Sequence, residues 1–356
     1  MLSIMKKLKE KTIQLCGIGN GLVDMQFRVP DEIITQIPNI VKGEMRLVNE
    51  LEQKSVIDLL KNIVPNKCSG GSATNTLYAL AQFGGKGAYL TCIGDDDNGK
   101  YYYDELSNIG LKYKNNAIKN KSTGTCLVLI TPDGERTMLT CLAASQDFDV
   151  QHIDEELIAS SEWLYIEGYK FSETSGVESI LKSIEIAKNN DTKIALTASD
   201  VFIVSSFRDN FVDALSKSDL IFCNENEAKA ITETNSSAAA FEKLEQLCKN
   251  VVMTMGKRGS IVFFEDEKYQ FPAVPTNVID TTGAGDMYAG AFLYGMLNFE
   301  DNYEKNTNEY DEYVDIYVNG NRIVKAGKLA SKSSSAIVSQ LGARYTGDIK
   351  KLMNLI

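Results

Sequence analysis

Short runs rich in β-branched residues alternate with helical patterns along most of this 356-residue chain, and this alternation limits its fold more than any other feature. The expected strands are 12–16, 87–92, 125–131, 163–167, 193–197, 220–223, 251–255 and 260–264. The clearest helical patterns between them are 73–83, 176–189, 209–217 and 238–247. Strands that alternate with helices pair in parallel, and a parallel sheet needs helices on both faces. The pattern therefore predicts an α/β protein with three layers, α/β/α, around a mostly parallel central sheet.

Three segments interrupt the alternation. Residues 27–48 and 122–141 look like β additions that project from the sheet as a small lid, and the second is expected to be a hairpin around 131–134. Residues 299–317 are rich in Asp, Glu, Asn and Tyr, which is typical of a solvated acidic insertion. Since no Pro/Gly-rich linker divides the chain, we expect residues 1–356 to form a single domain with this lid.

Composition excludes several classes of function. The net charge of −11 opposes binding to nucleic acid or to an anionic membrane, because both would repel an acidic surface. The sequence contains no apolar run long enough for a membrane span and no secretory signal. Seven cysteines without a C-x-x-C pair are expected to be reduced thiols of a cytoplasmic protein. The single histidine, His152, argues against a histidine-based metal site or a Ser-His-Asp triad.

The clearest chemical signal is the turn 280–286, Asp-Thr-Thr-Gly-Ala-Gly-Asp, which leads into the apolar run 287–297. Small residues before a helix let backbone amides approach an anion, which the helix dipole also favours. Asp286 at the helix entrance could take a proton from an attacking hydroxyl, or it could be an ordinary helix cap. The turn thus suits phosphoryl transfer, and the rest of the chain must decide between these readings.

Two polar segments near the N-terminus suit a small polar substrate. Residues 17–24 follow a strand, and their G-x-G-x-x-x-D spacing lacks the third glycine of a dinucleotide site. Asn20 and Asp24 could bind substrate hydroxyls there, or they could belong to a polar turn. Gly70 and Gly71 precede a helical segment in which Asn75 lies one turn further on, so all three could face the same ligand.

Two later segments suit a nucleotide. Asn224 and Glu227 lie three apart at an expected helix start, where they could hold the water shell of Mg²⁺ or cap the helix. Thr254 lies near the end of the expected strand 251–255, and Gly256 and Gly259 follow that strand. Gly256-Lys257 is not a P-loop, because it lacks the upstream glycine and the Ser/Thr of that motif.

Taken in order, these motifs resemble the ribokinase/PfkB family of ATP-dependent carbohydrate and nucleoside kinases. The first signature is matched by Gly70, Gly71, Asn75, Gly84 and Gly94, although Leu77 stands where a small residue is usual. Asn224 and Glu227 match an intermediate motif, and 280–293 match the C-terminal signature. The resemblance covers nearly the whole chain and implies ATP as co-substrate with Mg²⁺.

The resemblance also implies roles for individual residues. Asp286 would be the base, and the amides of Gly283, Ala284 and Gly285 would bind the transferred phosphoryl group. The residues implied to hold the substrate are Asn20, Asp24, Gly70, Gly71 and Asn75. Those implied at the ATP site are Asn224, Glu227, Thr254, Gly256 and Gly259, with Mg²⁺ held by the first two through water. Asp280 and Thr282 would hold a monovalent cation such as K⁺, assisted near Ile337, Gln340, Gly342 and Thr346.

Within this family the chain is most similar to the adenosine-kinase-like branch, on segments 19–24, 42–48, 123–126, 135–138 and 165–169. That similarity favours the 5'-hydroxyl of adenosine as acceptor. A sugar such as ribose, fructose or 2-keto-3-deoxygluconate is the alternative, and Arg136 and Lys170 could serve a sugar acid. A non-catalytic nucleoside- or sugar-binding regulator is the alternative from another class. Relatives act as monomers or homodimers, and the sequence does not choose between them.

Overall fold

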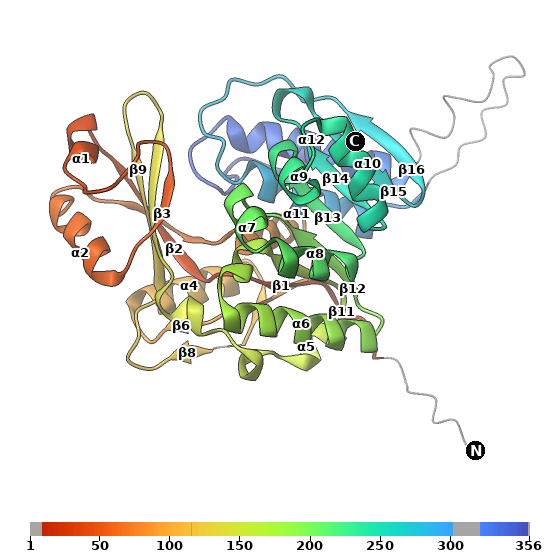
Figure 1. Ribbon diagram of the computed structural model, residues 1–356, viewed down its shortest axis with the longest axis horizontal. Helices are drawn as coiled ribbons and strands as arrows, with labels where there is room; N and C mark the ends of the chain where they lie inside the picture. The colour runs from red at the N-terminus through yellow and green to blue at the C-terminus, as the bar shows by residue number, and fades with distance from the viewer. Residues whose placement is uncertain (1–8, 115, 302–320, 355–356) are drawn as a thin grey trace, which may run out of the picture.

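The computed structural model describes residues 9–114, 116–301 and 321–354, and a nine-stranded sheet forms the centre of this part (Figure 1). Its strand order is β16-β15-β14-β13-β12-β11-β1-β5-β7. Pairings from β14 to β7 are parallel, and β15 and β16 extend one edge antiparallel. The strands are β1 (Ile13–Ile18), β5 (Gly87–Leu90), β7 (Lys112–Tyr113), β11 (Ser161–Glu167), β12 (Lys193–Thr197), β13 (Leu220–Asn224), β14 (Val251–Thr254), β15 (Ser260–Phe264) and β16 (Glu267–Phe271).

Helices cover both faces of this sheet, so the predicted three-layer fold is confirmed. One face packs against α5 (Glu155–Ala159), α6 (Thr174–Asn189), α7 (Val201–Ser206), α8 (Arg208–Ser216), α9 (Glu225–Thr232) and α10 (Ser237–Leu247). The other packs against α3 (Ser72–Gln82), α4 (Asp97–Asn108), α11 (Ala284–Asn298), α12 (Arg322–Val338) and α13 (Ile349–Met353).

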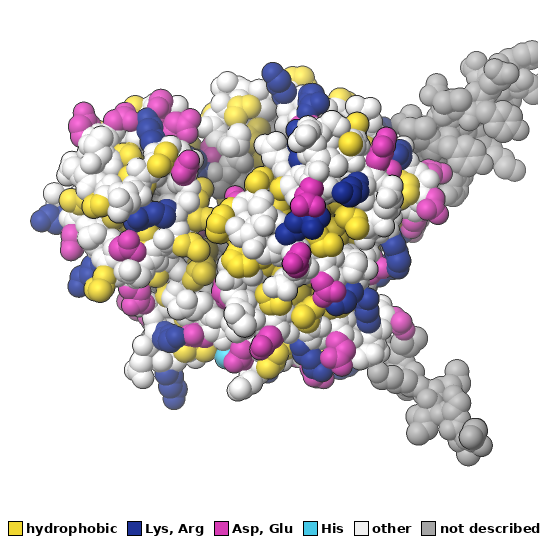
Figure 2. Space-filling model, viewed as in Figure 1, with side chains coloured by type: hydrophobic (Ala, Val, Ile, Leu, Met, Phe, Trp, Pro, Cys, Tyr) yellow, Lys and Arg dark blue, Asp and Glu magenta, His cyan; other side chains and the backbone are white. Residues whose placement is uncertain are grey.

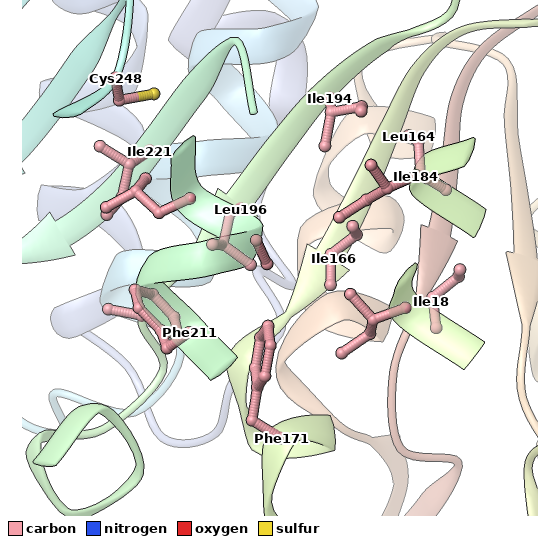
Figure 3. Packing of buried hydrophobic residues seen from close by; sticks show 14 of the residues in the cluster. Ile18, Leu164, Ile166, Phe171, Ile184, Ile194, Leu196, Phe211, Ile221 and Cys248 are labelled. Atoms are coloured by element: carbon pink, nitrogen blue, oxygen red, sulfur yellow. The ribbon is translucent and has the colours of Figure 1, made fainter. Parts of the chain in front are cut away.

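Both faces of the central strands are apolar, as a covered parallel sheet requires. In β11, Leu164 and Ile166 belong to the core on one face, and Trp163 and Tyr165 belong to the core on the other. Figure 3 shows the first of these cores, where side chains of the central strands point towards Ile184 of α6 and Phe211 of α8.

A second sheet stands beside the main body, on the left in Figure 1. Its order is β3-β10-β9-β2-β4, from strands β2 (Leu22–Arg28), β3 (Met45–Leu47), β4 (Asn66–Gly70), β9 (Gly124–Ile130) and β10 (Arg136–Cys141). The antiparallel pairing of β9 with β10 confirms the hairpin expected around 131–134. Both segments expected as a lid contribute strands to this sheet, and it also includes β4 and the start of β2. Residues 302–320, most of the expected acidic insertion, lie outside the described residues.

The two faces of the second sheet differ. Phe27, Leu127 and Leu139 point to one face and form a core with α1 (Asp31–Thr35) and α2 (Glu50–Leu59). Side chains alternate along a strand, so Arg136 and Met138 point to the opposite face. Since Arg136 reaches Asp280 in the turn before α11, that opposite face looks towards the main body.

Short elements complete the described chain. The strands β6 (Ile93–Gly94) and β8 (Ala117–Ile118) pair with each other. The 3₁₀ turns are η1 (Ala143–Asp147), η2 (Val150–His152), η3 (Gly168–Ser172) and η4 (Gly256–Arg258). The seven cysteines are all free, and six of them are buried. Within the described residues, every helix is too short or too polar to cross a membrane.

Candidate active site

The turn 280–286 ends in a tight helix entrance. Gly283 caps α11 with a φ of +70°, a left-handed conformation that side chains disfavour. A β-carbon on Gly283 would also lie 2.8 Å from Cα of Ala343, so two constraints require glycine there. Gly285, two residues further on, has no neighbouring atom from the rest of the described chain within 4 Å of such a carbon. The first turn of α11 therefore opens onto free space, where its unpaired amides suit an anion.

Asp286 is held by two side chains of α3. Its Oδ1 accepts a hydrogen bond from Ser72 Oγ at 2.6 Å, and its Oδ2 accepts one from Asn75 Nδ2 at 3.1 Å. Loss of water around the carboxylate raises the pKa of Asp286 to about 6, and the two hydrogen bonds oppose that rise. A carboxylate with a pKa near 6 is ionised at neutral pH yet accepts a proton readily, which suits a general base. Sequence reasoning did not assign a role to Ser72.

A buried glutamate at the end of β11 joins the two predicted substrate segments. Glu167 accepts hydrogen bonds from the backbone amides of Asn20 at 3.3 Å and Ala73 at 2.9 Å. Burial raises the pKa of Glu167 to about 7. The residue was missed at the sequence level as a site residue, although a carboxylate at the carboxyl end of a central strand was the available signal.

The five predicted substrate residues lie together around the start of α3. Gly71 caps α3 with a φ of +98°, and a β-carbon there would lie 2.1 Å from the carbonyl oxygen of Asn20. A β-carbon on Gly70 would lie 2.2 Å from Oδ1 of Asp24. Asn75 completes the group through its bond to Asp286. Burial raises the pKa of Asp24 to about 6, against the pull of nearby arginines.

A cavity of about 180 Å³ lies on the other side of Asp286, at the carboxyl ends of β12, β13 and β14. Its lining includes Thr197, Asn224, Glu227, Thr254, Gly285 and Asp286. Asn224 and Glu227 form a reciprocal capping box at the start of α9, so the helix-capping reading holds. Burial raises the pKa of Glu227 to about 7. Gly256 and Gly259 belong to or follow η4, directly after Thr254, and do not line this cavity.

Both carboxylate oxygens of Asp280, at the other end of the turn, accept hydrogen bonds. Its Oδ1 accepts hydrogen bonds from Arg136 Nη1 at 2.6 Å and the Thr282 amide at 2.9 Å, and its Oδ2 accepts one from the Gly342 amide at 2.8 Å. Burial alone would raise the pKa of Asp280, but these partners together lower it. The guanidinium of Arg136 thus lies against the carboxylate predicted for a monovalent cation, and that assignment stays a prediction.

The residues expected to assist that cation surround the same loop. Gln340 donates to the Arg344 carbonyl at 2.6 Å and accepts from the Thr346 amide at 3.1 Å. Within the described residues no cluster of three or more His, Cys, Asp or Glu side chains could hold a metal ion. Any cation here would therefore depend on backbone carbonyls and water as well as on side chains.

A larger cavity of about 730 Å³ lies where the second sheet joins the main body. Its lining includes Leu47, Val48, Thr140, Leu142, Ala143 and Gln146. Figure 2 shows the surface hollowed between the second sheet and the main body, with hydrophobic side chains along the border. The site-facing side of the sheet also carries an apolar cluster of Cys126, Val128, Ile130 and Met138.

Comparison with known proteins agrees with this geometry. A family profile described as "pfkB family carbohydrate kinase" matches residues 43–350. The chain belongs to the pfkB family of carbohydrate kinases. It is therefore an ATP-dependent kinase that phosphorylates an alcohol group, and the resemblance derived from the sequence motifs is confirmed.

Among similar proteins, the adenosine kinase of Saccharomyces cerevisiae is 28% identical over 311 residues, which cover 82% of this chain and 90% of that protein. The crystal structure of an adenosine kinase from Sinorhizobium meliloti superposes with a TM-score of 0.83 at 27% identity, covering 96% of this chain and 99% of that one. A probable sugar kinase from Rhizobium etli also gives a TM-score of 0.83, at 26% identity and 97% and 98% coverage. The pfkB kinase therefore has similar relatives of both substrate types.

Proposed function

We propose that this pfkB kinase transfers the γ-phosphoryl group of ATP to the 5'-hydroxyl of a nucleoside, with adenosine as the favoured acceptor. The observation that carries this choice is the apolar cluster on the site-facing side of the second sheet. Cys126 pairs with Asp24 across the β2–β9 register, so apolar side chains adjoin a carboxylate suited to sugar hydroxyls. A nucleoside needs this combination, because its base prefers an apolar slot and its ribose needs polar partners.

In the proposed reaction, the acceptor hydroxyl lies against Asp286 and the substrate group around Asn20, Asp24 and Asn75. Asp286 accepts the hydroxyl proton as the oxygen attacks the γ-phosphorus, and the bond to the β-phosphate oxygen breaks. The amides at the start of α11 stabilise the negative charge on the transferred group. Closure of the second sheet over the site would exclude water and so limit ATP hydrolysis.

The nucleotide would occupy the cavity beside Asn224, Glu227 and Thr254, with Gly256 and Gly259 at its outer edge. Both oxygens of Glu227 already accept hydrogen bonds from Asn224, which fits contact with Mg²⁺ through its water shell better than direct ligation. When bound, Mg²⁺ neutralises charge on the phosphates. Asn224 and Glu227 would orient its water ligands.

A sugar kinase is the second candidate, since the polar side chains of Asn20, Asp24 and Asn75 would also hold a free sugar. A sugar acid such as 2-keto-3-deoxygluconate has less support than ribose or fructose. Its carboxylate needs a cation, but Arg136 pairs with Asp280 and Lys170 pairs with Glu173. A non-catalytic regulator has no support, because Asp286 and both of its hydrogen-bond donors are in place.

A turnover screen tests the substrate. ATP consumption would be measured with adenosine, other nucleosides, ribose, fructose and 2-keto-3-deoxygluconate, each with and without K⁺. We expect the highest kcat/KM with adenosine. We also expect a charge on Met138, the partly buried member of the apolar cluster, introduced as Met138→Asp, to raise the KM for adenosine more than the KM for ATP. Strong turnover of a sugar with none of any nucleoside would overturn the nucleoside proposal and leave the kinase assignment intact.

The oligomeric state and the location are separate proposals. Gel filtration of the same preparation distinguishes a monomer from a homodimer. A cytoplasmic location is proposed on the reduced cysteines.

A further inference from the structure

A lysine lies fully buried beneath the proposed substrate site. Lys170 of η3 has no exposed side-chain surface, and its Nζ has three acceptors. These are Oε2 of Glu173 at 2.6 Å, the carbonyl oxygen of Ser145 at 3.1 Å and Oδ1 of Asn20 at 3.3 Å. An ammonium group has three N–H donors and no acceptor, so all three donors of Lys170 are used.

This contact fixes the orientation of the Asn20 amide. An ammonium group can face the oxygen of a carboxamide but not its NH₂ group. Ser145 Oγ adds a second constraint, because it accepts from the Gly21 amide at 3.2 Å and donates to Oδ1 of Asn20 at 2.8 Å. With Oδ1 occupied twice, the free part of the amide is Nδ2, and no described residue accepts a hydrogen bond from it.

The buried pair of Lys170 and Glu173 calls for a reason other than stability. Taking both charges out of water costs about as much as their attraction returns, so a buried pair does not by itself stabilise a fold. Here Oε1 of Glu173 lacks a hydrogen-bond partner among the described residues. Asn20, in contrast, gains a defined donor and a fixed backbone, since its amide nitrogen donates to Glu167.

We propose that Lys170 is a positioning residue that makes Asn20 an obligate hydrogen-bond donor to the acceptor substrate. The group bound by Asn20 is then an acceptor, such as a hydroxyl oxygen or a ring nitrogen. This inference rests on the proposed substrate role of Asn20. It adds how Asn20 is oriented and which chemical group it selects.

A double-mutant cycle tests the inference on the alcohol with the highest turnover in the screen above. Lys170→Met is combined with Glu173→Gln, so that no unpaired carboxylate is left buried, and the pair is made with and without Asn20→Ala. With Asn20 present, we expect the pair variant to lower kcat/KM for the alcohol by about tenfold or more, through KM, with the KM for ATP within about twofold. On the Asn20→Ala background it should change kcat/KM by less than about twofold.

The matched control is Lys182→Met with Glu185→Gln, an exposed pair with the same spacing on α6. This control should leave kcat and the KM values for the alcohol and for ATP unchanged. An equal loss from the Lys170 pair variant in both backgrounds, or no loss with Asn20 present, overturns the positioning role alone. No effect of Asn20→Ala by itself instead overturns the substrate role of Asn20. If the pair variant does not fold, Ser145→Ala is used instead, because it removes the other donor to Oδ1 of Asn20. If Ser145→Ala raises the KM for the alcohol equally on the Asn20→Ala background, the inference is contradicted.

Discussion

The two ends of the turn 280–286 carry the same side chain in opposite environments. Asp280 accepts hydrogen bonds from Arg136 and two backbone amides, and these lower its pKa despite burial. Asp286 pairs with no cation among the described residues and accepts only from the neutral donors of Ser72 and Asn75, and loss of water raises its pKa to about 6. The first carboxylate is thus held ionised as a structural anchor, and the second is left basic enough to take a proton. Partners, and not residue type, divide the two roles.

The largest expected effect is at the Asp286 end. Asp286→Asn preserves the shape and leaves one oxygen to accept a hydrogen bond from α3, but it removes the proposed base, so kcat should fall by roughly 10²- to 10⁴-fold. ATP binding, measured by calorimetry, should stay within about twofold of the original. Asp58→Asn, on the exposed face of α2, is the control and should leave turnover unchanged. Near-normal turnover of Asp286→Asn would show that another group takes the proton.

At the Asp280 end, Arg136→Met should mainly reduce stability. The side chain of Asp280 is only 1% exposed, so removal of its cation should lower the free energy of unfolding at pH 7 by roughly 3 kcal/mol. Because the pKa of Asp280 is lowered on folding, its contribution is present at neutral pH and is lost as the pH falls through that lowered pKa.

Urea denaturation across the pH range checks this prediction. The difference between Arg136→Met and the original protein should be largest at neutral pH and should narrow below about pH 4, where unfolded aspartates protonate. Arg322→Met breaks an exposed pair with Glu265 and is the matched control. A difference that does not change with pH would mean that Arg136 acts through packing and not through the charge of Asp280.

Alanine substitutions at two glycines between the carboxylates should affect stability and activity differently. Gly283→Ala should lower the free energy of unfolding by about 1–3 kcal/mol, since the new carbon meets Ala343 at a positive φ. Gly285→Ala has open space and a helical position, so stability should stay the same or rise by up to about 1 kcal/mol. Turnover of Gly285→Ala should nevertheless fall, because its methyl group would occupy the proposed phosphoryl site. Full activity of the stable Gly285→Ala protein would contradict that placement.

The smallest expected effect is a shift in the pH dependence of kcat/KM. Ser72→Ala removes a hydrogen bond that favours the charged form of Asp286, so the pKa of Asp286 should rise further above about 6. Activity requires the carboxylate, so the acid limb of the kcat/KM profile should move to higher pH, by about one unit. Ser55→Ala on α2 serves as the control. A lower rate with an unmoved acid limb would mean that Ser72 acts on the substrate rather than on the base.

Local pattern was sufficient for most of the central sheet. All eight expected strands and four expected helices are present, because buried strands leave apolar runs and amphipathic helices leave a clear period. Seven of the strands lie in the central sheet, and the eighth, expected at 125–131, is β9 of the second sheet. The second sheet was only partly foreseen. Strand β4 (Asn66–Gly70) has few apolar residues and derives its pairing from β2, so its sequence does not resemble a strand.

The sequence by itself determined the three-layer fold and the kinase family and singled out Asp286 with its glycine turn as the proposed centre, because these depend on residues close together in the chain. Only the tertiary structure decided which partners each charged side chain meets. Glu167 binds the backbone amides of Asn20 and Ala73, Arg136 pairs with Asp280, and Lys170 orients Asn20. Each of these contacts joins residues about 90 or more positions apart. The pKa of a carboxylate depends on such neighbours and on the loss of water, and neither is written in local sequence.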